Sequence, residues 1–494
     1  MNFHRGGFLM ALRTREEYLQ SLRALRPNIH KFDRRIEDVT TDPVTRRTVE
    51  SHARAFDAAG DKDRLDLFTC TSNLTGERIH RFNGLMPAME DVVQSARFKR
   101  AMYHLTGTCT GGLCVGWNAM NVLWAVTGDL DRDCGTAYQP RLKEWILRAQ
   151  EKGLVTAGAL TDAKGDRALK PSGQRDPDSH LRVVRVREDG IVIRGAKVMI
   201  AGVAAAHEIF ILPGSAYGEA DRDYAVACAV PRDIEGLTIV ETRRPSDGRE
   251  LDPGFDAPET GTSQAYLLFE DVFVPADRVF MCGEYGYTGR IIEYFTANYR
   301  ACIGACVAGQ GDVMIGAAAL VARANGLPAK TFAGKMVDMA VNNETTFGTG
   351  IGAIAMGRRH PAGIWFADPL LAHTNKVLVA TLPYETKRLA QEIGGGAVET
   401  GCFPSYADFI SPEYGHLVQK YMKAGPASGE TRARAARLVE WLTLGAGVPG
   451  CMHGGGSPDG ARLVVRSRTP VEEFVGYARA LAGIEEAVPE PAQK

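Results

Sequence analysis

Residues 181–200 read LRVVRVREDGIVIRGAKVMI and carry the clearest structural signal in the chain. Two runs rich in β-branched residues flank Glu188-Asp189-Gly190, and an Asp-Gly step between such runs favours a tight hairpin turn. Similar short runs follow at HEIFILPG (207–214), YAVACAVPRD (224–233) and AYLLFEDVFVPADRVF (265–280). The pattern predicts an antiparallel β-domain over residues 153–283.

Helical patterns flank this block on both sides. Residues 1–152 are mostly helical in pattern, with an interruption at Gly111-Gly112. The predicted helices of residues 284–494 are 289–324, 328–357, 369–391, 413–424, 428–445 and 470–483. The order of an N-terminal helical domain, a β-domain and a C-terminal helical domain indicates an α+β fold in three parts.

Composition excludes several classes of protein. The 494 residues include 58 Lys and Arg against 59 Asp and Glu, so no basic field is present for binding nucleic acid. The apolar run 301–322 contains Gln310 and Asp312, which favours a buried helix over a membrane span. Ten cysteines and no readable signal peptide predict a cytoplasmic protein with reduced thiols.

Four cysteines stand out by their spacing. Cys109 and Cys114 lie in LTGTCTGGLCVGW, where the two glycines let the chain curl so that both thiols face one way. Cys302 and Cys306 lie four residues apart in NYRACIGACVAGQGD, on one face of a helix that also carries Tyr299. Four such thiolates would suit a [4Fe–4S] cluster, but buried cysteines also pack as small hydrophobic residues.

Two glycine-rich segments and one polar loop are candidates for cofactor contacts. QEIGGGAVETG begins at Gln391 and contains Gly394 and Gly395, whose bare backbone suits an anion, although a helix end explains it equally well. CMHGGGSPDG places His453 beside three glycines. LTDAKGDRALKPSGQ offers Thr161, Asp162, Lys164 and Gln174, with a solvated surface loop as the alternative.

Several long blocks together resemble one family. They are LTDAKGDRALKPSGQRDPDSHLRVV (160–184), DVFVPADRVFMCGEY (271–285), CVAGQGDVMIGAAAL (306–320), NNET (342–345) and MHGGGSP (452–458). They are similar to 4-hydroxybutyryl-CoA dehydratases, from about Thr14 to Ile484. The wider group includes flavin-dependent 4-hydroxyphenylacetate 3-monooxygenases, with a fold like that of acyl-CoA dehydrogenases.

The resemblance implies FAD between the β-domain and the C-terminal helices of a homotetramer. It places Thr161, Asp162, Lys164 and Gln174 at the cofactor, with Thr161 and Lys164 on the isoalloxazine side. The glycine segment with Gln391, Gly394 and Gly395 resembles the one that reaches the adenosine half of a neighbouring subunit's FAD.

The resemblance also implies a [4Fe–4S] cluster, which the family holds with three cysteines and one histidine. Cys114 and Cys306 match two of the family's cysteines, whereas Thr110 stands at the third, one residue after Cys109. Tyr299 replaces the histidine, and Cys302 appears on the same helical stripe. The predicted ligands are Cys109, Cys114, Cys302 and Cys306, with Tyr299 as the alternative fourth ligand in place of Cys302.

Three family residues that move protons are replaced: Ile303, Val307 and Gly450 stand at those places. Tyr299 and His453 remain as candidate catalytic residues. The sequence thus predicts a FAD-dependent, redox-neutral elimination or isomerisation of an acyl thioester through flavin radical chemistry. The alternative is an FADH₂-dependent aromatic monooxygenase that receives reduced flavin from a separate reductase. A third, non-enzymatic hypothesis is a flavin-binding protein that has lost its catalytic residues.

Overall fold

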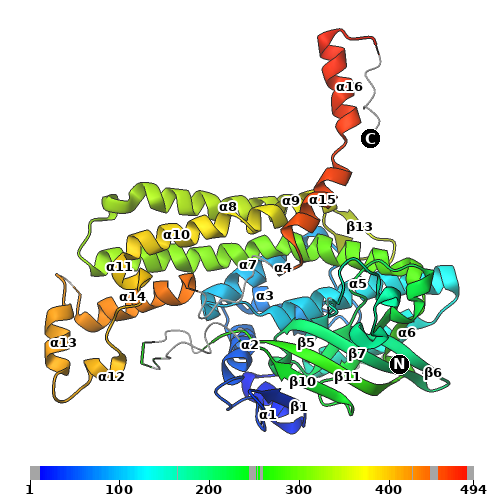
Figure 1. Cartoon of the computed structure of the whole chain (residues 1–494), viewed down its shortest axis with the longest axis horizontal. Coiled ribbons are helices and arrows are strands. Elements are labelled where there is room, and N and C mark those ends of the chain that lie inside the picture. The colour runs from blue at the N-terminus through cyan, green and yellow to red at the C-terminus, as the bar shows by residue number, and fades with distance from the viewer. Residues whose placement is uncertain are drawn as a thin grey trace, which may run out of the picture.

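The structure, a computed structural model, describes residues 12–163, 165–243, 252, 254–255, 260–425, 427–444 and 454–486. Helices form both ends of the chain and strands its middle, and a long helical bundle lies above the sheets (Figure 1). The expected α+β fold is confirmed. The helix predicted over residues 428–445 corresponds to the observed helix Gly429–Thr443. The last residue of the prediction, 445, lies outside the described residues.

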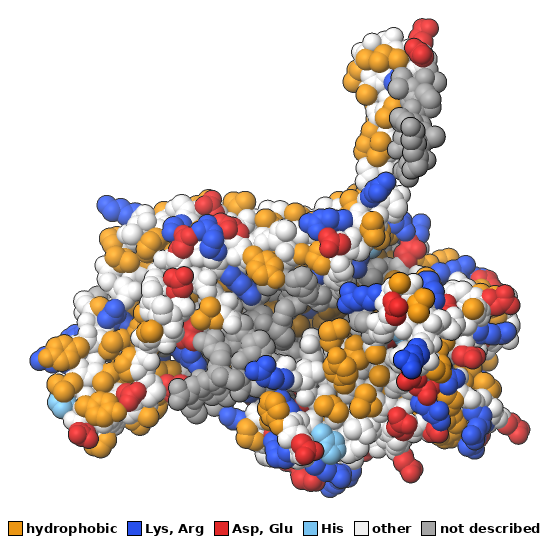
Figure 2. Space-filling model, in the orientation of Figure 1, with side chains coloured by type: hydrophobic (Ala, Val, Ile, Leu, Met, Phe, Trp, Pro, Cys, Tyr) orange, Lys and Arg blue, Asp and Glu red, His pale blue; other side chains and the backbone are white. Residues whose placement is uncertain are grey.

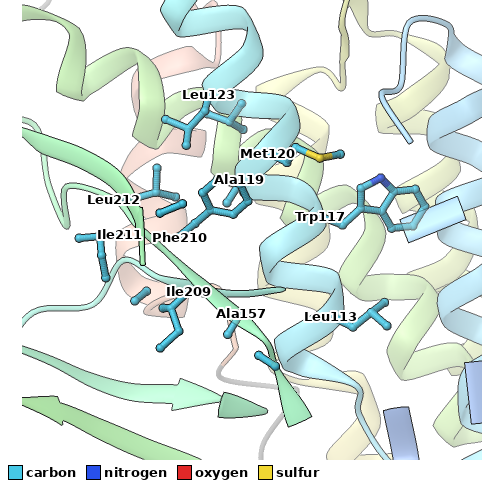
Figure 3. Packing of buried hydrophobic residues seen from close by; sticks show 14 of the residues in the cluster. Leu113, Trp117, Ala119, Met120, Leu123, Ala157, Ile209, Phe210, Ile211 and Leu212 are labelled. Atoms are coloured by element: carbon cyan, nitrogen blue, oxygen red, sulfur yellow. The ribbon is translucent and has the colours of Figure 1, made fainter. Parts of the chain in front are cut away.

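The N-terminal part is built around one long apolar helix. Its helices are α1 (Arg15–Ala24), α2 (Arg46–Gly60), α3 (Leu65–Phe68), α4 (Met89–Thr106), α5 (Gly111–Cys134) and α6 (Tyr138–Lys152). Its short strands are β1 (Asn28–Lys31), β2 (Arg34–Arg35), β3 (Thr69–Thr71) and β4 (Arg78–His80). Figure 3 shows α5 packing Leu113, Ala119 and Leu123 beside Phe210 and its neighbours from the β-domain. Burial of these side chains joins the two domains in one core.

The middle part forms two sheets. Its strands are β5 (Thr156–Ala159), β6 (Arg182–Arg187), β7 (Gly190–Ala201), β8 (Glu208–Ile211), β9 (Val226–Pro231), β10 (Leu237–Glu241), β11 (Gln264–Pro275) and β12 (Val279–Cys282). In the described part of the chain, the sheet orders are β2-β1-β10-β11-β7-β6 and β12-β9-β8-β5. The predicted hairpin is present, since β6 and β7 pair antiparallel with Arg187 opposite Gly190.

The expectation of a purely antiparallel β-domain is wrong. β5 pairs with β8 in parallel, and β1 from the N-terminal part pairs with β10 in parallel. A parallel pair needs a long crossover, and the segment between β5 and β8 supplies one because it contains the β6–β7 hairpin. Strand β10 had no counterpart among the runs picked out from the sequence.

The C-terminal part is a helical bundle with an extension. Its helices are α7 (Thr288–Ala324), α8 (Ala333–Ala355), α9 (Pro369–Val379), α10 (Leu382–Gly394), α11 (Gly396–Glu399), α12 (Tyr406–Phe409), α13 (Gly415–Met422), α14 (Gly429–Thr443), α15 (Pro458–Arg468) and α16 (Val471–Ala482). A small hairpin of β13 (Arg358–Arg359) and β14 (Trp365–Phe366) joins α8 to α9. The helix predicted over 369–391 is two helices, because Pro383 lacks the N–H that a continuous helix needs and instead lies in the first turn of α10. Helix α15 was missed.

Helix α7 is the axis of the bundle and packs against α4, α8, α9, α10 and α14. It is apolar and long enough to cross a membrane, but 67% of its most apolar window is buried inside the molecule, as in the core helix of a soluble fold. The prediction of a buried helix over the apolar run is therefore confirmed. Gly304 lets α8 and α9 come close, since a Cβ there would lie 2.3 Å from the Thr346 carbonyl oxygen.

Replacing Gly304 with alanine is expected to lower the free energy of unfolding by about 1–3 kcal/mol, because the new methyl group forces α7 away from α8. Chemical denaturation measures the change. Gly316→Ala on the same helix is the matched control, because nothing lies within 4 Å of its Cβ position. That variant should keep or slightly raise stability through helix propensity. Equal effects at both positions would contradict this view of the helix contact.

Candidate active site

A small cavity of about 60 Å³ lies where the N-terminal helices, the sheet and the bundle meet. Its described lining residues are Lys99, Cys109, Gly111, Cys114, Ala201, Thr262, Gln264, Tyr299, Ile303, Cys306 and Gly454. They come from α4, the start of α5, the facing ends of β7 and β11, α7, and the loop before α15. Segments from all three parts of the chain therefore build one site.

The start of α5 brings two of the cysteines to this cavity. The backbones of Gly112 and Gly202 pack directly against each other, because a Cβ on Gly112 would lie only 2.9 Å from the Gly202 Cα atom. Gly202 also has a φ of +70°, which glycine adopts at no steric cost. This close approach seats α5 against the end of β7, so that Cys109 and Cys114 both line the cavity.

The four candidate cysteines do not all reach the cavity wall. Cys306 lines it together with Cys109 and Cys114, whereas Cys302 is buried in the main hydrophobic core one helical turn away. In the described part of the chain, no three His, Cys, Asp or Glu side chains are grouped so that they could hold a metal ion. All four thiols nevertheless act on the Lys99 side chain, so they lie near it. The structure gives no support to the predicted four-cysteine [4Fe–4S] site, and Cys302 also packs in the hydrophobic core.

Lys99 is the residue that the sequence analysis missed. It is buried with only 5% exposure on α4, and it lines the cavity beside the cysteines. Burial by itself would lower the pKa of Lys99, but the nearby thiols of Cys302, Cys114, Cys306 and Cys109 act together to raise it. The site therefore contains an ammonium group, held among thiols and apolar side chains.

The signal for Lys99 was present in the sequence of α4. Val92, Ala96 and Tyr103 are buried on one face of this helix, and Lys99 occupies the same face. A lysine on an apolar helix stripe is rarely fully buried unless it has partners. In the sequence, Lys99 stands next to Arg100 in the run FKR, which is typical of a solvent-exposed charged segment.

Tyr299 is half-buried on α7 and lies at the cavity with its ring stacked on Phe295, the centroids 5.4 Å apart. Gly455 packs on the other side, where a Cβ would lie 2.7 Å from the Tyr299 ring. His453 lies outside the described residues, as do Gly450 and Cys451; Gly454, next to His453, lines the cavity. Tyr299, a candidate catalytic residue from the sequence, therefore lies at the cavity.

Two buried cations hold the glycine loop against the cavity. The Arg300 guanidinium donates to the Gly455 carbonyl oxygen at 3.0 and 3.1 Å, and Lys376 Nζ donates to the Gly454 carbonyl oxygen at 2.6 Å. Burial lowers the pKa of Arg300 to about 10. These hydrogen bonds hold Gly454 and Gly455 next to Tyr299.

The candidate flavin residues of the polar loop have different surroundings. Thr161 is half-buried at the end of β5, and its carbonyl oxygen accepts from the Val198 N–H. Gln174 closes the loop on itself, because its amide bonds the backbone of Asp166 in both directions. Lys164 lies outside the described residues.

Asp162 is directed into the domain. Its carboxylate forms a buried ion pair with Lys197 at 2.6 Å and accepts from the Tyr217 hydroxyl at 3.2 Å. Lys197 also donates to the carbonyl oxygens of Leu160 and Leu212, at 3.0 and 2.8 Å. This network fastens the first residues after β5 to the neighbouring strands.

Gln391, Gly394 and Gly395 lie at the end of α10, far from the β-domain of the same chain (Figure 1). Gly395 has a φ of +75° and ends the helix, while Gly396 begins α11. Nothing lies within 4 Å of the Cβ positions of Gly395 and Gly396, so a ligand can approach this backbone. Within one chain the two sets of candidate flavin residues are therefore not brought together.

The helical bundle and the β-domain enclose a buried, mainly apolar cavity that contains Lys99 and Tyr299. Models of the 4-hydroxyphenylacetate 3-hydroxylase N and C termini match residues 14–281 and 288–483. The chain belongs to this family of enzymes, which confirms the resemblance seen in the sequence.

Individual relatives are similar over the whole length. The chain is 38% identical to the 4-hydroxybutyryl-CoA dehydratase/vinylacetyl-CoA-Δ-isomerase of Clostridium aminobutyricum, over 96% of this chain and 100% of that protein. An oxygen-tolerant archaeal 4-hydroxybutyryl-CoA dehydratase from N. maritimus has a TM-score of 0.92 at 35% identity, covering 98% and 97% of the two chains. The oxygenase component of 4-hydroxyphenylacetate 3-monooxygenase, complexed with FAD, has a TM-score of 0.82 at 22% identity over 95% and 98%, which shows a common fold.

Proposed function

We propose that the protein is a FAD-dependent enzyme that acts on an acyl thioester by a redox-neutral elimination or isomerisation. The observation that carries the proposal is the 38% identity to a dehydratase/isomerase along its full length. A homotetramer is the expected form, because α10 and α11, which carry the open glycine segment, lie far from the β-domain of the same chain. A cytoplasmic location is the expectation from the cysteines, which are predicted to stay reduced.

FAD, when bound, would supply the electron-transfer chemistry of the reaction. Thr161 fits a position at the ring system because it is half-buried at the edge of the β-domain. Gly395 fits a contact to a neighbouring subunit's cofactor because its backbone is open to approach, whereas Gly394 packs against Val398. Asp162 would act indirectly, by holding the segment that carries Thr161.

Proton movement would fall to Lys99 and Tyr299. Ile303 and Val307 are apolar and cannot exchange a proton, although both lie in the cluster of side chains around the cavity. Among the described lining residues, Lys99 and Tyr299 carry the amine and the phenol that face this space. An ammonium group in a buried site can stabilise the developing negative charge of a thioester enolate and can return a proton to it.

The iron–sulfur cluster finds less support than FAD. Three cysteines converge on the cavity, but Cys302 lies in the core and Lys99 occupies the space beside the thiols. No step of the proposed reaction is therefore assigned to iron. Iron and acid-labile sulfide analysis of protein purified without oxygen decides whether a cluster forms.

A second candidate function is an FADH₂-dependent aromatic monooxygenase. It is favoured by the loss of proton-transferring residues at Ile303 and Val307 and by the family models that match both halves of the chain. Such an enzyme would need molecular oxygen and reduced flavin from a separate reductase. Its aromatic substrate would occupy the same apolar wall.

Anaerobic protein reconstituted with FAD is expected to convert 4-hydroxybutyryl-CoA or vinylacetyl-CoA, or a related short acyl thioester, without reductase or oxygen. Chromatography of the thioesters measures the conversion. Turnover of 4-hydroxyphenylacetate only when reduced FAD and oxygen are added would overturn the proposal in favour of the monooxygenase. Failure to retain FAD would exclude both functions.

A further inference from the structure

A further hollow lies outside the candidate active site. It has a volume of about 440 Å³ and is lined by residues of α5, α7 and the β13–β14 hairpin. Among the described residues, it shares no lining side chain with the cavity. Helix α5 runs past both, from Cys114 at the cavity to Asp129 at the hollow, which is roughly 22 Å of helix. The hollow is therefore a separate site.

Arginine side chains form much of its lining. Arg132 comes from α5, and Arg358 and Arg359 make up β13. Arg290 of α7 lies next to them, because it pairs with the same carboxylates as Arg132. Figure 2 shows further Lys and Arg side chains around the base of the projecting α16, at the end of the bundle where Figure 1 places β13. We call this site the arginine hollow.

Two carboxylates of α5 neutralise only part of this charge. The Asp129 side chain is 4% exposed, and its oxygens lie 3.0 Å from the guanidinium groups of Arg132 and Arg290. His360 Nε2 also lies 3.3 Å from this carboxylate. Asp133 pairs with Arg132 at 2.7 Å. Both carboxylates are therefore engaged by the arginines of α5 and α7.

Arg358 and Arg359 have no such partner. Both are exposed on β13, and no carboxylate of the described residues forms an ion pair with either of them. A Cβ at Gly363 would lie 3.7 Å from Arg359 Nη2, so this guanidinium lies beside the tip of the hairpin. Four arginines thus face two carboxylates. An anion at the hollow would compensate the excess positive charge, and arginine binds phosphate through two parallel N–H donors.

The hairpin that carries these two arginines is held by several hydrogen bonds. Trp124 Nε1 of α5 donates to the Ala362 carbonyl oxygen at 3.1 Å. The Trp365 N–H donates to the Met86 carbonyl oxygen at 2.9 Å, and the Asn298 side chain of α7 donates to the Trp365 carbonyl oxygen at 3.0 Å. Because the hairpin is fixed from three sides, a ligand does not have to order it on binding.

An aromatic pair forms another part of the lining. Tyr294 stacks on Phe366 with the ring centroids 4.4 Å apart. Burial and the Asp129 charge raise the pKa of Tyr294, whereas the charges of Arg290 and Arg358 act in the opposite direction. Both guanidinium groups therefore lie near the phenol. The hollow offers a neutral O–H donor and a flat ring beside its cations.

We propose that the arginine hollow binds the phosphate groups of a nucleotide. Arg358 and Arg359 hold the phosphate oxygens, and the Tyr294 hydroxyl donates a further hydrogen bond. The volume lies within the range of about 300–1,000 Å³ that is usual for small-molecule sites, so the hollow accommodates more than a lone phosphate ion. The Tyr294 ring supplies a surface for the base. Two sources supply this chemistry: a free nucleotide, and the nucleotide end of a coenzyme A thioester.

Titration calorimetry with ADP tests the site, on protein saturated with FAD so that the flavin site does not take up the probe. Arg358→Gln combined with Arg359→Gln is expected to weaken ADP binding by about 10-fold or more, because charged hydrogen bonds to phosphate are lost. Tyr294→Phe removes only the hydroxyl and should weaken binding about threefold. Arg185→Gln with Arg187→Gln is the matched control, because it removes two exposed arginines from β6 instead. Circular dichroism verifies that each variant folds.

Three results would overturn the proposal. The first is that the unchanged protein does not bind ADP at millimolar concentration. The second is that the variant without Arg358 and Arg359 binds ADP as tightly as the unchanged protein. The third is that this variant loses FAD, which would assign the hollow to the flavin rather than to a separate nucleotide.

Steady-state kinetics distinguishes the two sources, and this part of the test rests on the proposed function. If the nucleotide belongs to a coenzyme A thioester, the variant without Arg358 and Arg359 should raise KM for that thioester about 10-fold without changing kcat. Its reaction with the N-acetylcysteamine thioester, which carries no nucleotide, should stay unchanged. If the nucleotide is free, both thioesters should react as before while ADP binding alone weakens. Absence of thioester turnover in the unchanged protein would contradict the proposed function and would leave the calorimetric result to decide the site.

Discussion

Replacing Lys99 with methionine is expected to lower kcat/KM for the thioester reaction by about 10²–10⁴-fold, the usual contribution of a general acid or base. Lys99 Nζ is the amine at the cavity, and Ile303 and Val307 stand where relatives are expected to use proton-transferring residues. Methionine has a similar length and no charge, so it fills the same space without leaving a void. Steady-state kinetics of the reconstituted enzyme measures the loss, which should appear mainly in kcat.

Arg97→Met is the matched control for this experiment. Arg97 lies on the same helix α4, but its side chain is 58% exposed and its ion pair with Glu90 is long, at 3.9 Å. This variant should keep its activity within about twofold, since exposed ion pairs contribute little. Equal FAD content in both variants separates a chemical effect from loss of the cofactor. Lys99→Met with unchanged kcat would leave Tyr299 as the remaining proton carrier of the cavity.

Much of the fold follows from local sequence signals. The Asp-Gly step predicted the β6–β7 hairpin, and the apolar run predicted the buried helix α7, because both features depend on neighbouring residues. The parallel pairing of β5 with β8 could not be predicted in this way. It depends on how a crossover of nearly fifty residues folds back, which no single segment specifies.

The candidate site was predicted only in part for the same reason. The glycine pair at 111–112 correctly indicated that Cys109 and Cys114 share one surface. The helical spacing of Cys302 and Cys306 did not show that Cys306 lines the cavity while Cys302 packs in the core, still near Lys99, since each position depends on where α4 and α9 pack on α7. Lys99 was overlooked because its burial arises from that same packing.

Replacing Asp162 with alanine is expected to lower the free energy of unfolding by about 3–5 kcal/mol, the cost of leaving a buried charge without its partner. Lys197 is only 2% exposed and lies 2.6 Å from the Asp162 carboxylate. Its two carbonyl acceptors, Leu160 and Leu212, are neutral and do not compensate its charge. Urea denaturation of flavin-free protein measures the change, so that any contribution from bound FAD is excluded.

The double variant Asp162→Leu with Lys197→Met separates a structural role from a role at the cofactor. Removing both charges together should recover most of the stability, because neither partner is then left charged in the core. Tyr217→Phe should cost only about 1 kcal/mol, since it removes one hydrogen bond and leaves the ion pair in place. A stable Asp162→Ala protein that has lost FAD binding would instead mean that this carboxylate serves the flavin, as the sequence alone predicts. The buried geometry around Lys197 favours the structural role, because a carboxylate that already pairs with an amine and a phenol has little freedom to turn toward a ligand.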